Sequence, residues 1–166
     1  MQFSVGVEYA LHCLLYMVDL PTGQSVGIKD LAAYQGISST YLSKVYTKLQ
    51  KAGLVKTVPG VHGGCALAIG PDAITFWDVV EAVEGGAPLF QCAEIRQREA
   101  ILDPQHLPAA YRSDCPCLIK TVMVEAEEQM RTYLKKKTLR WLADQVEAKV
   151  PAEQQEKTKA WFAQAK

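Results

Sequence analysis

The sequence lacks a hydrophobic run that could cross a membrane. Its longest apolar stretch, near residues 10–18, is interrupted by His12 and is shorter than the roughly 20 residues that a bilayer requires. The basic segment and small-residue cleavage site of a secretion signal are also missing. Of the 166 residues, 49% are hydrophobic and 22% are charged, so the chain can bury a core. We expect a cytoplasmic protein with no membrane partner.

Net charge is absent as well, because 18 basic residues balance 18 acidic ones. A zero balance gives no overall attraction to nucleic acid. The lysines are nevertheless concentrated. Residues 1–60 contain five lysines and three acidic residues, and four of these lysines lie between Lys44 and Lys56. A local basic patch of this kind is compatible with DNA binding.

The five cysteines cannot all pair with one another, and no secretion signal accompanies them. Both features argue against a disulfide framework and favour metal binding or redox chemistry. Cys92, Cys115 and Cys117 fall within residues 89–117, a segment without regular periodicity. An irregular segment of this length is usually functional or disordered.

Apolar spacing predicts three helices in the first 52 residues. The first covers residues 3–20, the second covers residues 28–34 and closes at Gly36, and the third is capped by Ser38 or Ser39 and ends near Ala52. The expected buried face of the third helix consists of Leu42, Val45, Tyr46 and Leu49. Two helices joined by a tight turn that contains glycine indicate a helix-turn-helix.

A β-hairpin is predicted directly after the third helix. Its strands cover residues 54–58 and 65–69, and glycine-rich turns separate them. A hairpin that follows a recognition helix is the wing of a winged helix. The combination predicts a DNA-binding module in which the third helix reads double-stranded DNA.

Two further helices are predicted, one before and one after the irregular segment 86–117. A helix over residues 76–83 is capped by Thr75, and a long helix over residues 118–146 carries a coiled-coil-like apolar seam suited to a homodimer. A polar tail follows Pro151. We therefore expect a mainly α fold, a winged helix-turn-helix with a long C-terminal dimerisation helix. Its expected parts are the DNA-binding domain (1–85), a cluster-binding loop (86–117), the dimerisation helix (118–148) and the tail (149–166).

Several strings spread over residues 3–145 are similar to one protein family. They are Tyr9-Ala10-Leu11, Gly36-Ile37-Ser38, Lys51-Ala52-Gly53-Leu54-Val55, Gly63-Gly64, and Asp78-Val79-Val80 followed by Glu84-Gly85. With the order of elements, they resemble the winged-helix repressors that include the iron–sulfur regulator IscR, the nitric-oxide sensor NsrR and the redox regulator RsrR. The resemblance implies a dimeric transcriptional repressor and not an enzyme.

The RsrR branch of this family is the most similar. Its sequences share the strings Gly6-Val7-Glu8-Tyr9-Ala10-Leu11-His12-Cys13 and Cys92-Ala93-Glu94-Ile95-Arg96-Gln97-Arg98. The three closely spaced cysteines of the wider family are missing, since the next cysteine after Cys92 lies 23 positions later. The resemblance therefore implies a [2Fe-2S] cluster with mixed Cys, Glu and His ligands, and operator affinity that changes when the cluster gains or loses one electron.

Glu8 and His12 are four residues apart and share one helical face, so both side chains can reach one metal. Thiolates suit iron–sulfur clusters, and imidazole can replace them on one iron. The predicted ligands are Glu8, His12, Cys92 and Cys115, with Cys117 as the alternate to Cys115. We predict that Cys13 is a core residue and that Cys65 packs in the wing.

The predicted DNA contacts lie on the helix-turn-helix and the wing. Hydroxyls at the N-terminus of a recognition helix meet phosphates and base edges, and lysines on its exposed face bind phosphates. The predicted set is Lys29, Ser39, Thr40, Tyr41, Lys44, Lys48, Lys56 and His62.

Two other functions stay open from the residues alone. The same DNA-binding fold can be switched by thiol oxidation among Cys92, Cys115 and Cys117, without a metal. A small metal hydrolase using Glu8 and His12 is a weaker alternative, because the sequence shows no nucleophile elbow or phosphate loop.

Overall fold

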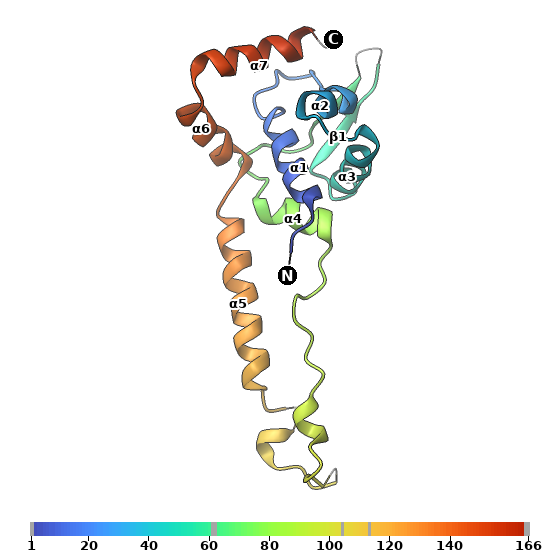
Figure 1. Ribbon diagram of the computed structural model, residues 1–166, viewed down its shortest axis with the longest axis vertical. Helices are drawn as coiled ribbons and strands as arrows, with labels where there is room; N and C mark the ends of the chain where they lie inside the picture. The colour runs from blue at the N-terminus through green and yellow to red at the C-terminus, as the bar shows by residue number, and fades with distance from the viewer. Residues whose placement is uncertain (1, 61–62, 104, 113, 165–166) are drawn as a thin grey trace. The chain divides into compact units, whose positions relative to one another are not determined.

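The computed structural model describes residues 2–60, 63–103, 105–112 and 114–164 (Figure 1). The described chain is mainly helical, with one two-stranded antiparallel sheet. The elements in chain order are α1 (Val5–Leu15), α2 (Ile28–Gln35), α3 (Ser39–Lys51), β1 (Val55–Val58), β2 (Gly64–Leu67), α4 (Phe76–Glu84), the 3-10 helices η1 (Ile95–Arg98) and η2 (Ala109–Tyr111), α5 (Leu118–Lys135), α6 (Leu139–Lys149) and α7 (Ala152–Gln164).

The chain forms two compact units. Residues 2–86 and 134–164 make up the first, which we call the winged-helix unit, and residues 87–133 make up the second, which we call the cysteine unit. The boundary between them falls within the last turn of α5. Each unit has its own set of internal contacts.

The winged-helix unit contains the predicted helix-turn-helix. Helix α2 ends at Gly36, whose φ of 66° lies in the left-handed region that favours glycine. Two residues later the Ser38 hydroxyl accepts a hydrogen bond from the Tyr41 N–H and caps α3. Of the two candidate caps, Ser38 is therefore the one used. The turn can be short because backbone groups at both helix ends find hydrogen-bond partners within it.

Helix α3 buries the face that its sequence pattern predicts. Leu42 and Leu49 are fully buried and Val45 and Tyr46 nearly so. This face packs against α1, α4 and β1. Burying each of these side chains contributes about 1.5–3 kcal/mol, which fixes α3 on the unit and leaves its opposite face to solvent.

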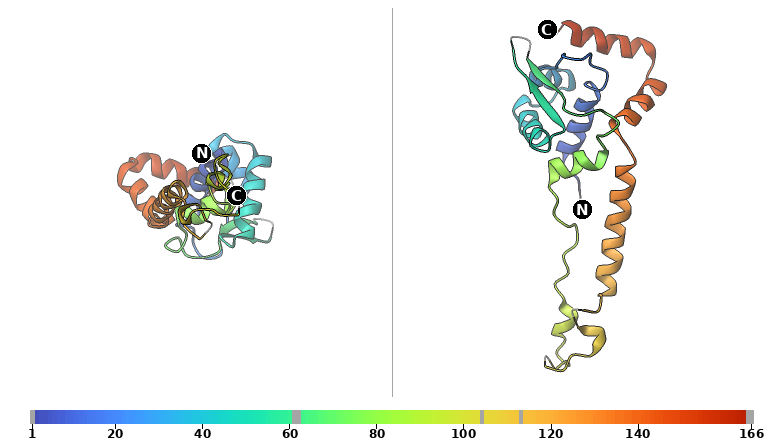
Figure 2. Two further views of the ribbon diagram at one scale, coloured as in Figure 1. Left: turned by 90° about the horizontal axis from the view of Figure 1, so that it is seen from below. Right: turned by 180° about the vertical axis from the view of Figure 1, so that it is seen from behind.

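Strands β1 and β2 form the predicted wing, visible beside α3 in Figure 2. Val55 pairs with Leu67 and Val58 with Gly64. Strand β2 is held to the α1–α2 loop, because Val26 and Cys65 exchange both backbone hydrogen bonds. A Cβ on Gly64 would come within 2.4 Å of the Val26 carbonyl oxygen. Glycine at this position lets the two backbones approach.

Helix α4 begins as predicted at a Thr75 cap. The Thr75 hydroxyl accepts from the Asp78 N–H, and the Asp78 carboxylate accepts from the Thr75 N–H, which forms a capping box. Trp77, Val79 and Val80 are buried on the inner side of the helix.

Two predicted helix lengths are wrong. Helix α1 ends at Leu15 and not at Leu20. After it, the Met17 and Val18 N–H groups donate to carbonyls three residues back, and not four as in an α-helix. The single helix expected over residues 118–146 is two helices, α5 and α6. The Thr138 side chain caps α6, and its backbone forms a bridge with Thr75. This tertiary pairing overrides the local helix preference.

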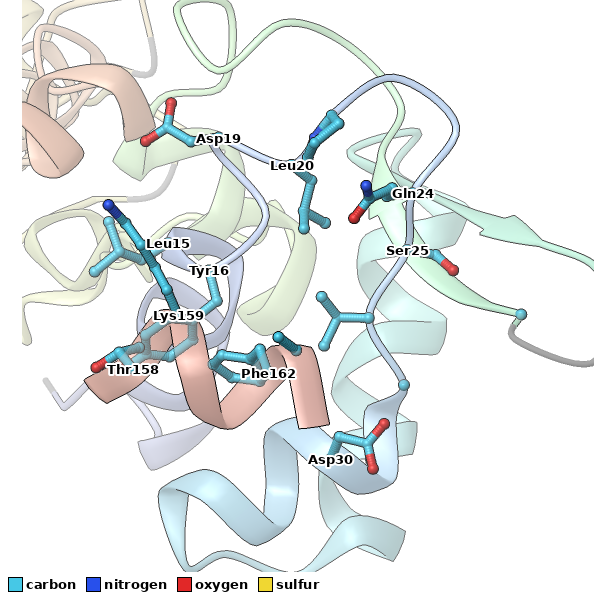
Figure 3. Close-up of a pocket in the computed structure, with 15 residues that line it drawn as sticks. Leu15, Tyr16, Asp19, Leu20, Gln24, Ser25, Asp30, Thr158, Lys159 and Phe162 are labelled. Carbon is cyan, nitrogen blue, oxygen red and sulfur yellow. The ribbon is translucent and has the colours of Figure 1, made fainter. Parts of the chain in front are cut away.

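The predicted polar tail, residues 149–166, contains a further helix, α7, over residues 152–164. Phe162 packs on Tyr16 and Tyr34, and the Tyr34 hydroxyl bonds the Thr158 hydroxyl at 2.7 Å. Figure 3 shows Thr158, Lys159 and Phe162 beside Leu15 and Tyr16. These residues contribute to the lining of a cavity of about 490 Å³. Aromatic packing against the first two helices thus orders this segment.

The cysteine unit contains α5, the two 3-10 helices and extended chain between them. The Leu89 N–H donates to the Glu127 carboxylate of α5 at 3.0 Å. Glu127 also pairs with Arg131 one turn later. These bonds hold the extended start of the unit along α5.

Tyr46 gives a direct test of the core around α3. Its hydroxyl is buried and has no hydrogen-bond partner among the described residues. We expect Tyr46→Phe to raise the free energy of unfolding by about 1–2 kcal/mol, because the buried unpaired hydroxyl is removed. Leu49→Ala should lower it by about 2–5 kcal/mol. Urea unfolding followed by circular dichroism measures both, and a destabilised Tyr46→Phe would contradict the assignment.

Candidate functional site

The free face of α3 forms the candidate DNA-reading surface. Ser39, Thr40, Tyr41 and Lys44 are all exposed. Thr40 and Lys44 lie opposite the buried face, and Ser39 and Tyr41 lie beside it. Ser39 and Thr40 lie in the first turn, where helix N–H groups point outward and attract anions. The sequence prediction therefore agrees with the exposure of these four residues.

Lys48 lies further along α3 and is engaged differently. Its ammonium donates to the Val83 carbonyl in the last turn of α4, at 2.6 Å. A lysine at this position satisfies a carbonyl that the helix leaves unpaired and interacts favourably with the negative end of the helix. The bond draws Lys48 toward α4, so we expect Lys44 and not Lys48 to contact a phosphate.

The other predicted DNA contacts are spread over α2 and the wing. Lys29 on α2 and Lys56 on β1 are both at least partly exposed. His62 lies outside the described residues. The wing therefore offers one described lysine for backbone contacts.

Tyr9 is a contact residue that sequence reasoning missed. Its ring packs edge-on against Tyr41, with the centroids 5.8 Å apart. Tyr9 follows Glu8 on α1, and Tyr41 stands at the start of the recognition helix. The pair connects the helix that carries two predicted ligands to the DNA-reading surface.

Glu8 and His12 are exposed on the same side of α1, as the spacing predicts. Both line a cavity of about 640 Å³ within the winged-helix unit. Its other walls are mostly apolar and include Phe76 of α4 and Leu142 and Val146 of α6. The two candidate ligands thus stand at an apolar groove that water and a partner segment can enter.

The three loop cysteines belong to the cysteine unit and are all partly exposed. The structure places the Cys92 side chain close to that of Cys117. Cys92 also lies close to the Glu94 carboxylate. Cys115 instead lies beside Arg96, whose guanidinium donates to the Cys115 carbonyl and contacts its side chain.

The environment of Cys117 favours a thiolate. Its pKa is lowered by a hydrogen bond from the Lys120 N–H, with further contributions from the Ile119 N–H, the Arg96 charge and Cys92. Lys120 and Ile119 lie in the first turn of α5, where the helix dipole attracts negative charge. The structure therefore distinguishes Cys117 from Cys115, which the sequence could not do.

Cys13 and Cys65 have no such environment. Both are buried, and burial raises the pKa of Cys13 to about 12 and that of Cys65 above its usual value. The predicted core and wing positions of these two residues are confirmed. Neither thiol is poised to react or to bind a metal.

No cluster of three or more Cys, His, Asp or Glu side chains suited to a metal occurs among the residues that the structure describes. Cys92 and Cys117 lie in the cysteine unit, whereas Glu8 and His12 belong to the winged-helix unit. The donor types fit an iron–sulfur cluster chemically, because thiolates and an imidazole are accepted iron ligands. Each unit therefore contains two of these four candidate ligands.

An exposed recognition helix, a capped helix-turn-helix and a hairpin wing define a winged-helix DNA-binding regulator. The chain belongs to the Rrf2 family, whose model, described as an iron-dependent transcriptional regulator, matches residues 3–145. Members of this class regulate transcription and are not enzymes. No helix in the described part of the chain is long and apolar enough to span a membrane.

Relatives support this family membership. The HTH-type transcriptional regulator NsrR of Halalkalibacterium halodurans is 31% identical over 84% of this chain and 88% of its own length. NsrR of Geobacillus kaustophilus is 36% identical over 63% of this chain and 71% of its own length.

Solved structures share the fold. T. potens IscR superposes with a TM-score of 0.64 at 24% identity, covering 91% of this chain and 93% of that one. The cysteine regulator CymR of B. subtilis gives a TM-score of 0.61 at 24% identity, covering 87% and 97%. The predicted mainly α winged-helix fold is confirmed.

Lys44 and Lys48 form a matched pair for testing the DNA-reading surface. Lys44→Ala should weaken operator binding and reduce the slope of log affinity against log salt by about 0.9 for each phosphate that is no longer neutralised. Lys48→Ala should weaken binding without changing this slope, because the bond that it removes joins α3 to α4 and neutralises no phosphate. Fluorescence anisotropy at several salt concentrations measures both. An equal fall in slope for the two variants would contradict the different roles.

Proposed function

We propose that this regulator is a redox-sensing repressor that binds operator DNA as a homodimer. A [2Fe-2S] cluster held by Glu8, His12, Cys92 and Cys117 would set its affinity for DNA. The observation that carries the proposal is the position of Cys117 at the N-terminus of α5, beside Arg96 and close to Cys92. That position favours Cys117 over Cys115 as the second thiolate.

The chemistry of the four side chains supports a cluster that remains intact during a redox change. Such a cluster supplies one-electron chemistry, with a potential that imidazole ligation raises. The positive surroundings of Cys117 stabilise thiolate, which is the form that binds iron. We expect the oxidised holo form to bind DNA more tightly than the reduced form.

The resemblance to the RsrR branch supports ligation across the dimer, with Glu8 and His12 from one subunit and two loop cysteines from the other. The resemblance implies Cys92 and Cys115 for these two, and the position of Cys117 at the N-terminus of α5 favours Cys117 in place of Cys115. The apolar groove at Glu8 and His12 is open to a partner segment. Ligation across the interface would let a redox change act on the helix that also carries Tyr9, and through Tyr9 on Tyr41 of α3.

A metal-free switch is the second candidate, and the position of Cys117 close to Cys92 favours it. Cys92 and Cys117 would lose two electrons and two protons to a peroxide-class oxidant, which forms a disulfide, water and an alcohol. Colour separates the two candidates. An anaerobically purified brown protein with iron and sulfide supports the cluster, and a colourless, iron-free protein supports the disulfide.

Helix α5 supports the proposed dimer. Ile119 and Val122 are 67% and 62% exposed, and Tyr133 is 62% exposed. With Ala126 and Met130 between them, they recur at helical spacing along one face. An exposed apolar stripe of this kind marks an interface between proteins.

Val122 and Val124 provide a matched test of that stripe. Val122→Glu should raise the dimer dissociation constant by more than about 100-fold, because an unpaired charge would be buried at the interface. Val124→Glu makes the same chemical change roughly 200° around the helix and should leave the dimer intact. Sedimentation velocity measures the dissociation constants. A monomeric wild-type protein, or equal effects of the two variants, would refute this interface.

The ligand set is tested by single alanine variants. Cys92→Ala and Cys117→Ala should lose iron and visible absorption, because each removes a thiolate. Glu8→Ala and His12→Ala should retain weakened absorption with a shifted spectrum. Cys115→Ala should retain the cluster, as should Cys13→Ala, which controls for loss of any thiol. Loss of the cluster in Cys115→Ala but not in Cys117→Ala would reverse the assignment of the two cysteines.

Ligation across the dimer has its own test. A heterodimer carries Glu8→Ala with His12→Ala in one chain and Cys92→Ala with Cys117→Ala in the other. Ligation across the dimer predicts one complete site and about half the wild-type iron per dimer. Ligation within each chain predicts two broken sites and no normal spectrum, and that result would rule out the shared site.

A further inference from the structure

The Arg96 side chain lies at the centre of the cysteine unit and is only 17% exposed. Its Nε donates to the Glu94 carboxylate at 3.1 Å. Its Nη1 donates to the Ala110 carbonyl at 2.5 Å, and its Nη2 donates to the Arg112 and Cys115 carbonyls at 3.1 and 2.5 Å. One guanidinium therefore holds one carboxylate and three carbonyls.

The three carbonyls belong to the chain that leads into Cys115-Pro116-Cys117. Over residues 105–112 this chain contains only the three-residue helix η2 among the described residues. Backbone carbonyls outside regular structure need other donors when they leave water. Arg96 supplies those donors from a planar group whose fork has a fixed geometry.

Glu94 connects the same guanidinium to Cys92. It adopts a φ of 49°, which no other non-glycine residue in the described chain shares, since the remaining positive values belong to glycines. A left-handed conformation is unfavourable for a residue with a side chain. The reversal at Glu94 lets its carboxylate accept from Arg96 and lie close to the Cys92 thiol.

We propose that Arg96 is the positioning residue of the cysteine site, which holds the segment containing Cys117 against Cys92. Through Glu94 it fixes the Cys92 side, and through the three carbonyls it fixes the approach to Cys117. The role of Cys92 and Cys117 in redox sensing rests on the proposed function. The contacts of Arg96 do not depend on a metal. Without Arg96 the two thiols belong to a chain with far more conformational freedom.

The effective concentration of Cys92 and Cys117 for each other measures this role. Metal-free protein is equilibrated anaerobically with reduced and oxidised glutathione in a Cys115→Ala background. One oxidised glutathione and the two protein thiols exchange for one protein disulfide and two reduced glutathiones. Peptide mass spectrometry identifies the Cys92–Cys117 disulfide, and the equilibrium constant gives the effective concentration.

Arg96→Gln should lower the effective concentration at least about tenfold, since the chain between the thiols gains freedom. Arg96→Lys should lower the effective concentration as much, because lysine keeps the positive charge but lacks the planar guanidinium that binds several carbonyls. Arg98→Gln is the matched control: it removes an exposed arginine from the same short helix and should remain within about twofold of wild type.

The outcome is decisive in each arm. Wild-type behaviour of Arg96→Lys would replace the positioning role with a charge effect and overturn the proposal, as would an unchanged Arg96→Gln. Cys13 and Cys65 are buried, so their protection from thiol labelling reports that the winged-helix unit is folded. If Arg96→Gln loses that protection, Arg96→Lys decides alone. The glutathione equilibrium is measured on metal-free protein, so its result does not depend on a cluster. If anaerobically purified wild-type protein is colourless, the proposed cluster is refuted and the positioning role of Arg96 is not affected.

Discussion

The burial of one face of α3 is the constraint on which the winged-helix unit depends. Leu42, Tyr46 and Leu49 are removed from water between α1, α4 and β1. Because one face is fixed in this way, Thr40 and Lys44 stand on the other in a set orientation. The Ser38 cap and the left-handed Gly36 then determine where the helix begins. DNA reading follows from core packing, since a recognition helix that rocked on the unit could not hold a register on base edges.

The end of α4 is where several contacts meet. Lys48 of α3 donates to the Val83 carbonyl, and the Ser4 N–H donates to the Glu84 carboxylate. Glu84 is followed by Gly85, with a φ of 91°, and the cysteine unit begins two residues later. A shift of this helix end would therefore alter the hydrogen bonds that join it to α3 and to the start of α1. Coupling between a redox site and the DNA-reading surface requires such an element, shared by both.

The cysteine unit is organised by polar contacts more than by a core. None of the described residues 87–133 is buried, so hydrophobic packing contributes little to their arrangement. Arg96, Glu94 and Glu127 instead hold the backbone at a few points. A segment held in this way has low local stability, and binding of a metal or a partner can add to it.

The sequence by itself determined the elements whose signals are local. Apolar spacing located α2, α3 and α4, and Gly36, Ser38 and Thr75 marked their ends, because caps and periodicity act within a few residues. The exposure of Glu8 and His12 on one side of α1 followed from their four-residue spacing. Tertiary structure decided the rest. The bridge between Thr75 and Thr138 broke the long helix, and Tyr16 and Tyr34 ordered α7. It also placed Cys117 close to Cys92 and Arg96, because these contacts join positions far apart in the chain that no local pattern encodes.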